Sequence, residues 1–347
     1  MIHGFEQPMP SLDGKTIMVT GGTGSFGSAF VEMVLERWSP RRIIVFSRDE
    51  MKQLLMSQRF GQHDALRFFI GDVRDVDRLE LAMREVDLVV HAAALKQVPA
   101  AEYNPIECIK TNVHGAENVV KASLRTKVQK VVALSTDKAA SPLNLYGASK
   151  LAADKIFVAA NNLSAGRGPK FSVVRYGNVL GSRGSVVPLF SRLIAEGVKR
   201  LPITDERMTR FWITLGQGVS FVLSSMEMMR GGEIFIPKIP SMKITELARA
   251  LKPDIAFDTV GIRPGEKLHE VMITEDDARS TIEMEDRYVI LPIIVFDPGH
   301  VAHDSEAFAN ARPVPEGFRY SSDSNAEWLA QDDLLALIRE IDVHGND

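Results

Sequence analysis

Short apolar segments alternate with longer amphipathic ones through the first half of the chain. The apolar segments, rich in valine and isoleucine, cover residues 16–20, 42–46, 66–70, 86–90, 130–134 and 171–176. Runs of this kind are typical of strands buried on both faces, as in a parallel sheet covered by helices. Between two of them Val113, Ala116, Val120 and Leu124 recur at helical spacing. The pattern predicts an α/β fold of the Rossmann type, with a doubly wound parallel sheet.

The alternation of apolar and amphipathic segments ends after Gly181, where segments become short and prolines become frequent. Helical patterning returns at 213–229 and again at 326–341. We therefore expect a Rossmann domain over 12–180 and, over 181–292, mainly a smaller C-terminal lobe that binds substrate at the carboxyl edge of the sheet. Part of the later chain should return to the first domain. Residues 293–347 are expected to form a C-terminal packing segment.

Composition narrows the class of protein. The formal charge of −4 offers no basic field for nucleic acid or a membrane surface. A single cysteine, Cys108, excludes an internal disulfide framework and suits a reducing cytoplasm. The first residues lack a targeting pattern, and no apolar run reaches the length of about 18 residues needed to span a membrane. We expect a cytoplasmic protein that binds neither nucleic acid nor membrane.

A glycine-rich turn follows the first predicted strand. In TGGTGSFG, three glycines stand in G-x-x-G-x-x-G spacing directly before an amphipathic helix. Glycines there let the backbone approach a pyrophosphate, whose charge then faces the N–H groups at the helix start. The strand before and the helix after are the context that this motif requires. The sequence predicts a dinucleotide site.

The end of the second strand indicates which dinucleotide. Ser47 and Arg48 stand where an NAD enzyme usually keeps an acid for the ribose hydroxyl, which favours NADP, although Asp49 and Glu50 leave NAD possible. Later strand ends should line the same groove. The predicted cofactor residues are Gly21, Thr23, Gly24, Ser25, Phe26, Gly27, Ser47, Arg48, Asp72, Val73, Ala92, Ala93, Ala94, Asn112, Tyr146 and Lys150.

The stretch STDKAASPLNLYGASK, residues 135–150, carries the candidate chemistry. Tyr146 and Lys150 are four apart at the start of a predicted helix, so they share one face. A lysine ammonium and the cationic nicotinamide would lower the pKa of the phenol and make it a usable base for an alcohol proton. With Thr136 at the strand end, this set resembles the redox triad of the extended short-chain dehydrogenase/reductase superfamily.

Asp137 and Lys138 extend that resemblance to the sugar nucleotide 4,6-dehydratases, which carry Thr-Asp-Glu at the matching place. In those enzymes C4 is oxidised to a ketone, which makes the C5 proton acidic. Water is then lost across C5 and C6, hydride returns to C6, and NADP is regenerated. The third residue here is a lysine. It can act as the C5 base only when neutral, which burial and the nearby Lys150 would favour.

A closer resemblance is carried by 135–150 together with 171–190, 204–214, 231–248 and 261–273. From about Leu12 to about Trp328 the chain resembles the inverting UDP-N-acetylglucosamine 4,6-dehydratases of pseudaminic acid biosynthesis, the PseB type. The resemblance implies Asp137 as general acid, Lys138 as base and Tyr146 as an aid to C4 oxidation. Related retaining enzymes, often membrane-anchored, have Met where Tyr146 stands, so the resemblance favours the inverting branch.

The substrate UDP-N-acetylglucosamine brings a diphosphate, which guanidinium groups match well. The candidate substrate residues are Lys96, Asn178, Arg183, Arg207, Arg210, Arg263 and Glu266, with Glu266 expected to orient its basic neighbours. The motifs expected of glycoside hydrolases and zinc enzymes are absent from the sequence, so we expect no metal.

Two alternatives stay open. One is an epimerase or retaining dehydratase on the same fold, and the other is a catalytically silent dinucleotide sensor. In this superfamily the helices corresponding to 105–125 and 146–161 often pack between subunits. The resemblance therefore implies a homo-oligomer, as a dimer or a larger assembly such as a hexamer.

Overall fold

The computed structural model describes residues 3–164, 168–182, 185–294 and 306–345. Its centre is a ten-stranded sheet in the order β16-β14-β15-β10-β6-β5-β4-β1-β2-β3. Strands β3 to β10 in this order are parallel, and β15 turns the sheet antiparallel. The strands are β1 (Thr16–Thr20), β2 (Arg42–Ser47), β3 (Leu66–Ile70), β4 (Leu88–His91), β5 (Lys130–Thr136), β6 (Lys170–Tyr176), β10 (Ile234–Pro237), β14 (Thr281–Glu283), β15 (Arg287–Ile290) and β16 (Arg312–Pro313).

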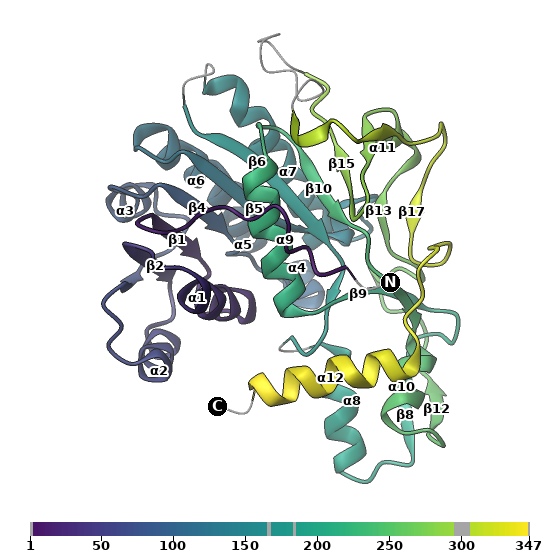
Figure 1. Ribbon diagram of the computed structural model, residues 1–347. Coiled ribbons are helices and arrows are strands. Elements are labelled where there is room, and N and C mark those ends of the chain that lie inside the picture. The colour runs from purple at the N-terminus through teal and green to yellow at the C-terminus, as the bar shows by residue number, and fades with distance from the viewer. Residues whose placement is uncertain (1–2, 165–167, 183–184, 295–305, 346–347) are drawn as a thin grey trace.

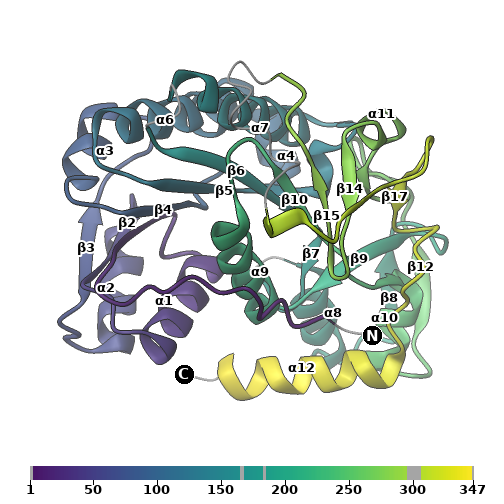
Figure 2. The ribbon, with the colours of Figure 1, turned by 45° about the horizontal axis from the view of Figure 1, so that its top comes forward.

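Helices cover both faces of this sheet, as Figure 2 shows. One face carries α3 (Val76–Ala82), α4 (Val98–Tyr103), α5 (Pro105–Ile109), the π-helix η1 (Lys110–His114), α6 (Gly115–Arg125) and α7 (Leu145–Leu163). The other carries α1 (Ser25–Arg37), α2 (Glu50–Phe60) and α9 (Leu215–Met228). The predicted α/β fold with a doubly wound parallel sheet is confirmed.

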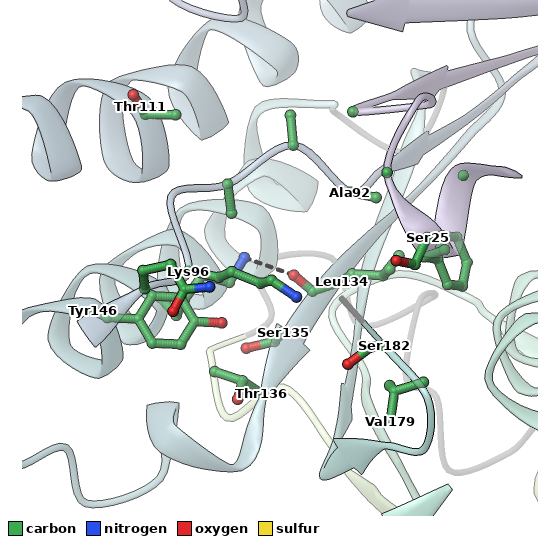
Figure 3. A pocket seen from close by; sticks show the side chains of 18 of the residues that line it. Ser25, Ala92, Lys96, Thr111, Leu134, Ser135, Thr136, Tyr146, Val179 and Ser182 are labelled. Atoms are coloured by element: carbon green, nitrogen blue, oxygen red, sulfur yellow. Dashed lines mark hydrogen bonds between the residues drawn. The ribbon is translucent and has the colours of Figure 1, made fainter. Parts of the chain in front are cut away.

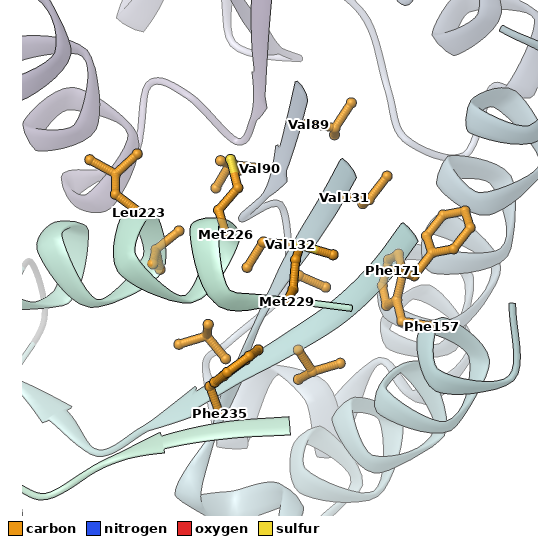
Figure 4. Close-up of a cluster of buried hydrophobic side chains, with 14 of the residues drawn as sticks. Val89, Val90, Val131, Val132, Phe157, Phe171, Leu223, Met226, Met229 and Phe235 are labelled. Carbon is orange, nitrogen blue, oxygen red and sulfur yellow. The ribbon is translucent and has the colours of Figure 1, made fainter. Parts of the chain in front are cut away.

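The main hydrophobic core lies between the sheet and these two helix layers. Valines of β4 and β5 are fully buried, with Phe157 and Phe171 to one side and Leu223 and Met226 of α9 to the other (Figure 4). Each such side chain contributes about 1.5–3 kcal/mol of burial free energy. The apolar runs of the sequence therefore correspond to strands that are buried in this core.

A second, smaller core belongs to the lobe after β6. It is built by β7 (Asn178–Val179), α8 (Val186–Ala195), β8 (Arg200–Ile203), β9 (Thr209–Ile213), β11 (Ser241–Lys243), α10 (Ile244–Leu251) and β12 (Ala256–Thr259). Phe190, Leu201 and Trp212 are buried in it, and Leu334 of α12 (Gln331–Gly345) joins them. Figure 1 shows α12 beside α8 and α10. Leu334 of α12 thus contributes to this second core.

Three short elements connect the lobe to the sheet. β13 (Val271–Ile273) pairs with β17 (Tyr320–Ser321), and α11 (Glu275–Ala278) follows β13. Two 3₁₀ turns in the described part of the chain are η2 (Asp137–Ala139) and η5 (Glu306–Phe308). Strands β10, β14 and β15 come from 181–292 and lie in the large sheet. No helix in the described ranges is long and apolar enough to cross a membrane.

Candidate active site

A cavity of about 940 Å³ opens at the carboxyl ends of the parallel strands (Figure 3). This edge of the sheet is where folds of this type bind ligands. The cavity is lined by most of the predicted site residues, namely Gly21, Thr23, Gly24, Ser25, Phe26, Gly27, Ser47, Arg48, Asp72, Val73, Ala92, Ala93, Ala94, Lys96, Thr136, Lys138, Tyr146, Lys150, Asn178 and Glu266. Residues from both lobes therefore share one cavity.

The glycine loop is shaped for a close approach of backbone to ligand. Gly21 has φ of +66°, a conformation that favours glycine. A Cβ on Gly27 would lie 2.3 Å from the carbonyl oxygen of Gly22, so only glycine lets α1 pack on the loop. Gly24 caps α1 without a side chain. The first N–H groups of α1 are thus left for an anionic ligand, as a pyrophosphate requires.

The end of β2 presents two cations to the same cavity. Arg48 Nη1 lies 3.6 Å from Asp72 Oδ2, and Lys52 Nζ lies 3.1 Å from Asp49 Oδ2. The hydroxyls of Thr23 and Ser47 are 2.8 Å apart. Both cations are more than half exposed, so they can turn toward a bound anion at small cost.

Three buried polar atoms on the cavity wall lack a hydrogen-bond partner within the described part of the chain. They are Thr111 Oγ1, Asn178 Oδ1 and Ser185 Oγ. Buried polar groups in folded proteins are nearly always bonded. A ligand with hydroxyl and amide groups would satisfy these atoms, and the residues present therefore fit a dinucleotide and a polar substrate.

Thr136, Asp137 and Lys138 stand where β5 ends and η2 begins. The Thr136 hydroxyl donates to Asp137 Oδ1 over 2.9 Å, and Lys138 Nζ donates to the same oxygen over 3.0 Å. On its other side Lys138 Nζ lies 3.2 Å from Glu270 Oε1. The side chains of Asp137 and Glu270 are 1% and 2% exposed, whereas that of Lys138 is 26% exposed. Lys138 lines the cavity, whereas Asp137 and Glu270 do not.

The ionisation of this group is set by competing effects. Burial lowers the pKa of the Lys138 ammonium, but the carboxylates of Asp137 and Glu270 outweigh it and raise the pKa. Burial also raises the pKa of Asp137; Lys138 opposes this shift and Glu270 adds to it. Sequence reasoning expected burial and Lys150 to favour a neutral lysine. The balance is reversed because a second carboxylate, Glu270, comes from a distant segment.

Glu270 behaves differently from Asp137. Burial opposes its ionisation, but the cations of Lys138, Arg210 and Lys267 lower its pKa. Arg210 Nε and Lys267 Nζ lie 3.8 and 3.9 Å from its two carboxylate oxygens. The two carboxylates that contact Lys138 thus have pKa values shifted in opposite directions. Asp137 is the one that takes up a proton more readily.

Tyr146 and Lys150 both line the cavity from the first turns of α7, as their spacing predicts. Lys150 Nζ donates to the carbonyl oxygen of Leu134 over 2.6 Å, the dashed line in Figure 3. Burial raises the pKa of Tyr146 to about 12, although Lys138 and hydrogen bonding with Thr136 oppose the shift. Lys138, where the sequence suggested Lys150, is therefore the cation that opposes the rise in this pKa.

Asn112 lies in the π-helix η1, a local irregularity often found near functional sites. Its side-chain oxygen accepts from the N–H of Leu95 over 2.8 Å, and its amide donates to Leu95 O and to Ser149 Oγ over 3.0 and 2.9 Å. Asn112 does not line the cavity. It fastens the loop after β4, which carries Lys96, to the helix that carries Tyr146.

The predicted substrate arginines differ in their surroundings. Arg207 is 72% exposed and bonded to Asp205, and Arg263 is 69% exposed and lies 3.4 Å from Glu266. Arg210 is buried and donates to the carbonyl oxygens of Thr209, Leu268 and Lys267. None of the three lines the cavity in the described part of the chain. Arg183 lies outside the described residues, and the binding role of all four stays a prediction.

Several residues of the site were not predicted. Among them, Lys52 and Tyr176 line the cavity, and Glu270 contacts Lys138. Lys52 could have been found as a basic residue in the first turn of the helix after Arg48, and Tyr176 as the last residue of a strand. For Glu270 no local pattern exists, because it is brought to Lys138 only by the pairing of β13 with β17.

Comparisons with known proteins show which enzymes this chain is similar to. The chain is 57% identical over 331 residues to a Campylobacter jejuni protein named UDP-N-acetylglucosamine 4,6-dehydratase (inverting), covering 94% of this chain and 98% of that one. It is 45% identical over 285 residues to a UDP-glucose 4-epimerase of Rickettsia canadensis, covering 80% and 82%.

A solved structure and a family model also match this chain. Pen from Bacillus thuringiensis superposes with a TM-score of 0.85 at 35% identity, covering 96% of this chain and 99% of that one. The predicted resemblance to inverting UDP-N-acetylglucosamine 4,6-dehydratases is thus confirmed. The model of the family described as polysaccharide biosynthesis protein matches residues 17–292. The chain therefore belongs to the polysaccharide biosynthesis protein family.

Proposed function

We propose that this protein is a lyase that removes water from UDP-N-acetylglucosamine with inversion at C5. The product would be UDP-2-acetamido-2,6-dideoxy-β-L-arabino-hexos-4-ulose, which fits the first step of pseudaminic acid biosynthesis. One observation carries the proposal: Thr136, Lys138, Tyr146 and Lys150 reach the same cavity as the glycine loop, in a chain 57% identical to an enzyme of this name.

The first step is removal of the O4 proton of the sugar. Tyr146 is the base at the cavity wall, and the cation of Lys138 stabilises its phenolate. NADP, which the glycine loop and the end of β2 would hold, would supply the hydride acceptor for C4 and the hydride donor for C6. Lys150, held on the carbonyl of Leu134, lies on the same wall and orients the bound groups.

The second step needs an acid for the departing O6 and a base for the C5 proton. Asp137 and Lys138 share one proton across a hydrogen bond of 3.0 Å. Shifting that proton to Asp137 makes the neutral amine and the carboxylic acid together, without changing the buried charge. Lys138 then takes the C5 proton, and Asp137, whose pKa is raised by burial, supplies the proton that leaves with O6.

NADP is proposed over NAD because of the cations at the end of β2. Arg48 and Lys52 line the cavity beside the hydroxyls of Ser47 and Thr23, a set that suits a 2′-phosphate. Lys96, Asn178 and Glu266 line the sugar end. Arg183, Arg207, Arg210 and Arg263 are proposed to bind the UDP diphosphate, which requires Arg207 and Arg263 to turn toward the cavity.

A homo-oligomer is proposed through the helices at 105–125 and 146–161. Exposed apolar side chains in or next to these segments support it, since Tyr103, Ile106 and Leu143 are 88%, 58% and 65% exposed. The proposal of a cytoplasmic protein rests on the sequence alone.

The test is incubation with UDP-N-acetylglucosamine that carries deuterium at C4, followed by NMR of the product. We expect the deuterium at C6 of a 4-keto-6-deoxy sugar without added NADPH, and an inverted C5. In D₂O, unlabelled substrate should gain one deuterium at C5. Deuterium found in free cofactor would instead indicate an ordinary dehydrogenase.

The second candidate is an epimerase or retaining dehydratase, and the similarity to the Rickettsia protein named UDP-glucose 4-epimerase favours it. The same NMR experiment separates the two. An epimerase would give a C4 epimer that keeps its 6-hydroxyl, and a retaining enzyme would give the original C5 configuration. No reaction together with tight NADP binding would favour a dinucleotide sensor.

A further inference from the structure

Glu270 is a buried carboxylate that contacts Lys138 but does not line the cavity. Its side chain is 2% exposed, and its Oε1 lies 3.2 Å from Lys138 Nζ. We propose that Glu270 is a positioning residue of this site. Together with Asp137 it holds the Lys138 nitrogen at the cavity wall, through an ion pair with a carboxylate that does not itself line the cavity. This inference rests on the proposed function, because it assigns Glu270 a part in the loss of water.

The backbone of Glu270 is fixed on both sides. Its N–H donates to Ser322 Oγ over 2.9 Å, and its carbonyl oxygen accepts from the N–H of Ser322 over 2.8 Å and from Ser321 Oγ over 3.3 Å. A lysine has a long, flexible stem, and a single ion pair with its sequence neighbour Asp137 leaves the nitrogen free to swing. A second carboxylate, held rigidly on a different segment, removes that freedom.

Glu270 also affects the net charge of the buried groups around Lys138. The buried cluster consists of Asp137, Lys138, Arg210, Lys267 and Glu270. In the proposed second step Lys138 is a neutral amine and Asp137 is a carboxylic acid, so Glu270 is the anion that faces the cations of Arg210 and Lys267. Without Glu270 the cluster would hold these two buried cations and no anion, which is costly. Glu270 therefore limits the buried positive charge in both protonation states of the Asp137 and Lys138 pair.

The substitution Glu270→Gln tests this role because it removes the charge and keeps the shape. Tyr146 and Lys150 remain, so C4 oxidation should proceed while water loss slows. We expect kcat to fall by about tenfold to a hundredfold, a usual cost of disturbing general acid–base catalysis, with KM for UDP-N-acetylglucosamine changed less than about twofold. Reduced nicotinamide, followed by its absorbance in a single turnover, should accumulate.

The matched control is Glu233→Gln. Glu233 is also fully buried, and its carboxylate accepts from Ser172 Oγ and from the N–H of Arg230 over 2.6 and 2.7 Å, away from the cavity. This variant should lose stability without accumulating reduced nicotinamide. If Glu233→Gln and Glu270→Gln behave alike, Glu270 has only a structural role and the proposal is overturned.

The pH profile is an independent readout. Removing an anion lowers the pKa of a neighbouring ammonium, so in Glu270→Gln the limb of kcat that depends on neutral Lys138 should move to lower pH by about one unit. The charged or titratable groups facing Lys138 are Asp137, Tyr146, Arg210, Lys267 and Glu270. If Glu270→Gln keeps the kcat of the parent and this part of its pH profile does not shift, the proposal is contradicted.

Two further variants keep the test decisive if Glu270→Gln does not fold. Glu270→Asp keeps the charge but draws it back from Lys138, and Ser322→Ala removes the hydroxyl that fixes the Glu270 N–H. Each should accumulate reduced nicotinamide to a smaller extent, and neither doing so would overturn the proposal. If the unmodified protein itself does not remove water, the proposed function fails instead, so the two failures can be told apart.

Discussion

Two lysines in one cavity have their pKa values shifted in opposite directions. Burial lowers the pKa of both ammonium groups. At Lys138 two carboxylates reverse the effect, whereas at Lys150 the single carboxylate of Asp154 opposes burial without overcoming it. The same residue type is therefore proposed to have two roles here: Lys138 would exchange a proton with Asp137, whereas Lys150 is hydrogen-bonded to a backbone carbonyl. At the scale of single residues, the number of buried carboxylates within reach decides the chemistry.

His91, at the end of β4, provides a prediction about stability. It is buried against the Thr20 hydroxyl at 2.8 Å, and burial, with Lys150, lowers its pKa to about 3. The unfolded chain takes up the proton near pH 6.5 and the folded chain does not, so stability is lost as the pH falls below that value. We expect a loss of about 2 kcal/mol from this group between pH 7 and pH 5.

Urea unfolding of the parent and of His91→Gln at both pH values checks this. The variant will be less stable at pH 7 but should show a smaller loss on going to pH 5. Equal losses in the two proteins would mean that His91 is not responsible.

At the scale of elements, the sequence predicted strands more accurately than their ends. Predicted segments 16–20 and 66–70 coincide with β1 and β3. The segment 86–90 starts too early, because the Asp87 carboxylate accepts the N–H of Thr16 and the strand begins after it. The predicted helix 326–341 also starts too early, because the chain is still extended at Leu329, whose N–H donates to Ser241 O. Apolar periodicity does not register such contacts between distant segments.

The same distinction applies to the candidate site. The glycine loop and the stretch 135–150 could be predicted because their residues are neighbours in sequence and each acts where one strand meets one helix. Glu270 and the buried position of Arg210 could not be predicted. Both depend on how β9, β13 and β17 are brought together, which no local pattern encodes.

Gly27 gives a prediction at this scale. Its substitution by alanine would place a Cβ against the Gly22 backbone at 2.3 Å, and since backbone cannot move aside, the start of α1 must shift. We expect NADP binding, measured by calorimetric titration, to weaken at least about tenfold as pyrophosphate contacts are lost. Gly218→Ala on α9 is the control, because nothing lies within 4 Å of the added methyl group. If both variants bind NADP equally, the loop does not hold the pyrophosphate.

At the scale of the whole molecule, the Tyr320 side chain joins segments of the main core that are far apart in the sequence. The Tyr320 hydroxyl donates to the carbonyl oxygen of Ile239 over 3.0 Å and accepts from its N–H over 2.9 Å. Its ring packs on Phe211 of the lobe and Tyr288 of the large sheet. This one side chain thus connects β17, the lobe and the sheet.

Tyr320→Phe should therefore destabilise the protein by about 1–3 kcal/mol, because it leaves a buried N–H and a buried carbonyl without their partner. The midpoint of urea unfolding is the measurement. Tyr103→Phe, at an 88% exposed position, should leave that midpoint unchanged. A Tyr320→Phe midpoint equal to that of the parent would show that these backbone groups find another partner.

Ser321 and Ser322, which fix the backbone of Glu270, are made by the ribosome well after Pro237, the last residue of the parallel strands. A growing polypeptide can therefore assemble the glycine loop and its parallel strands while the support behind Lys138 is still missing. On this view dinucleotide capture precedes catalytic competence during biosynthesis, and the sugar nucleotide is first consumed only after the later segment has docked.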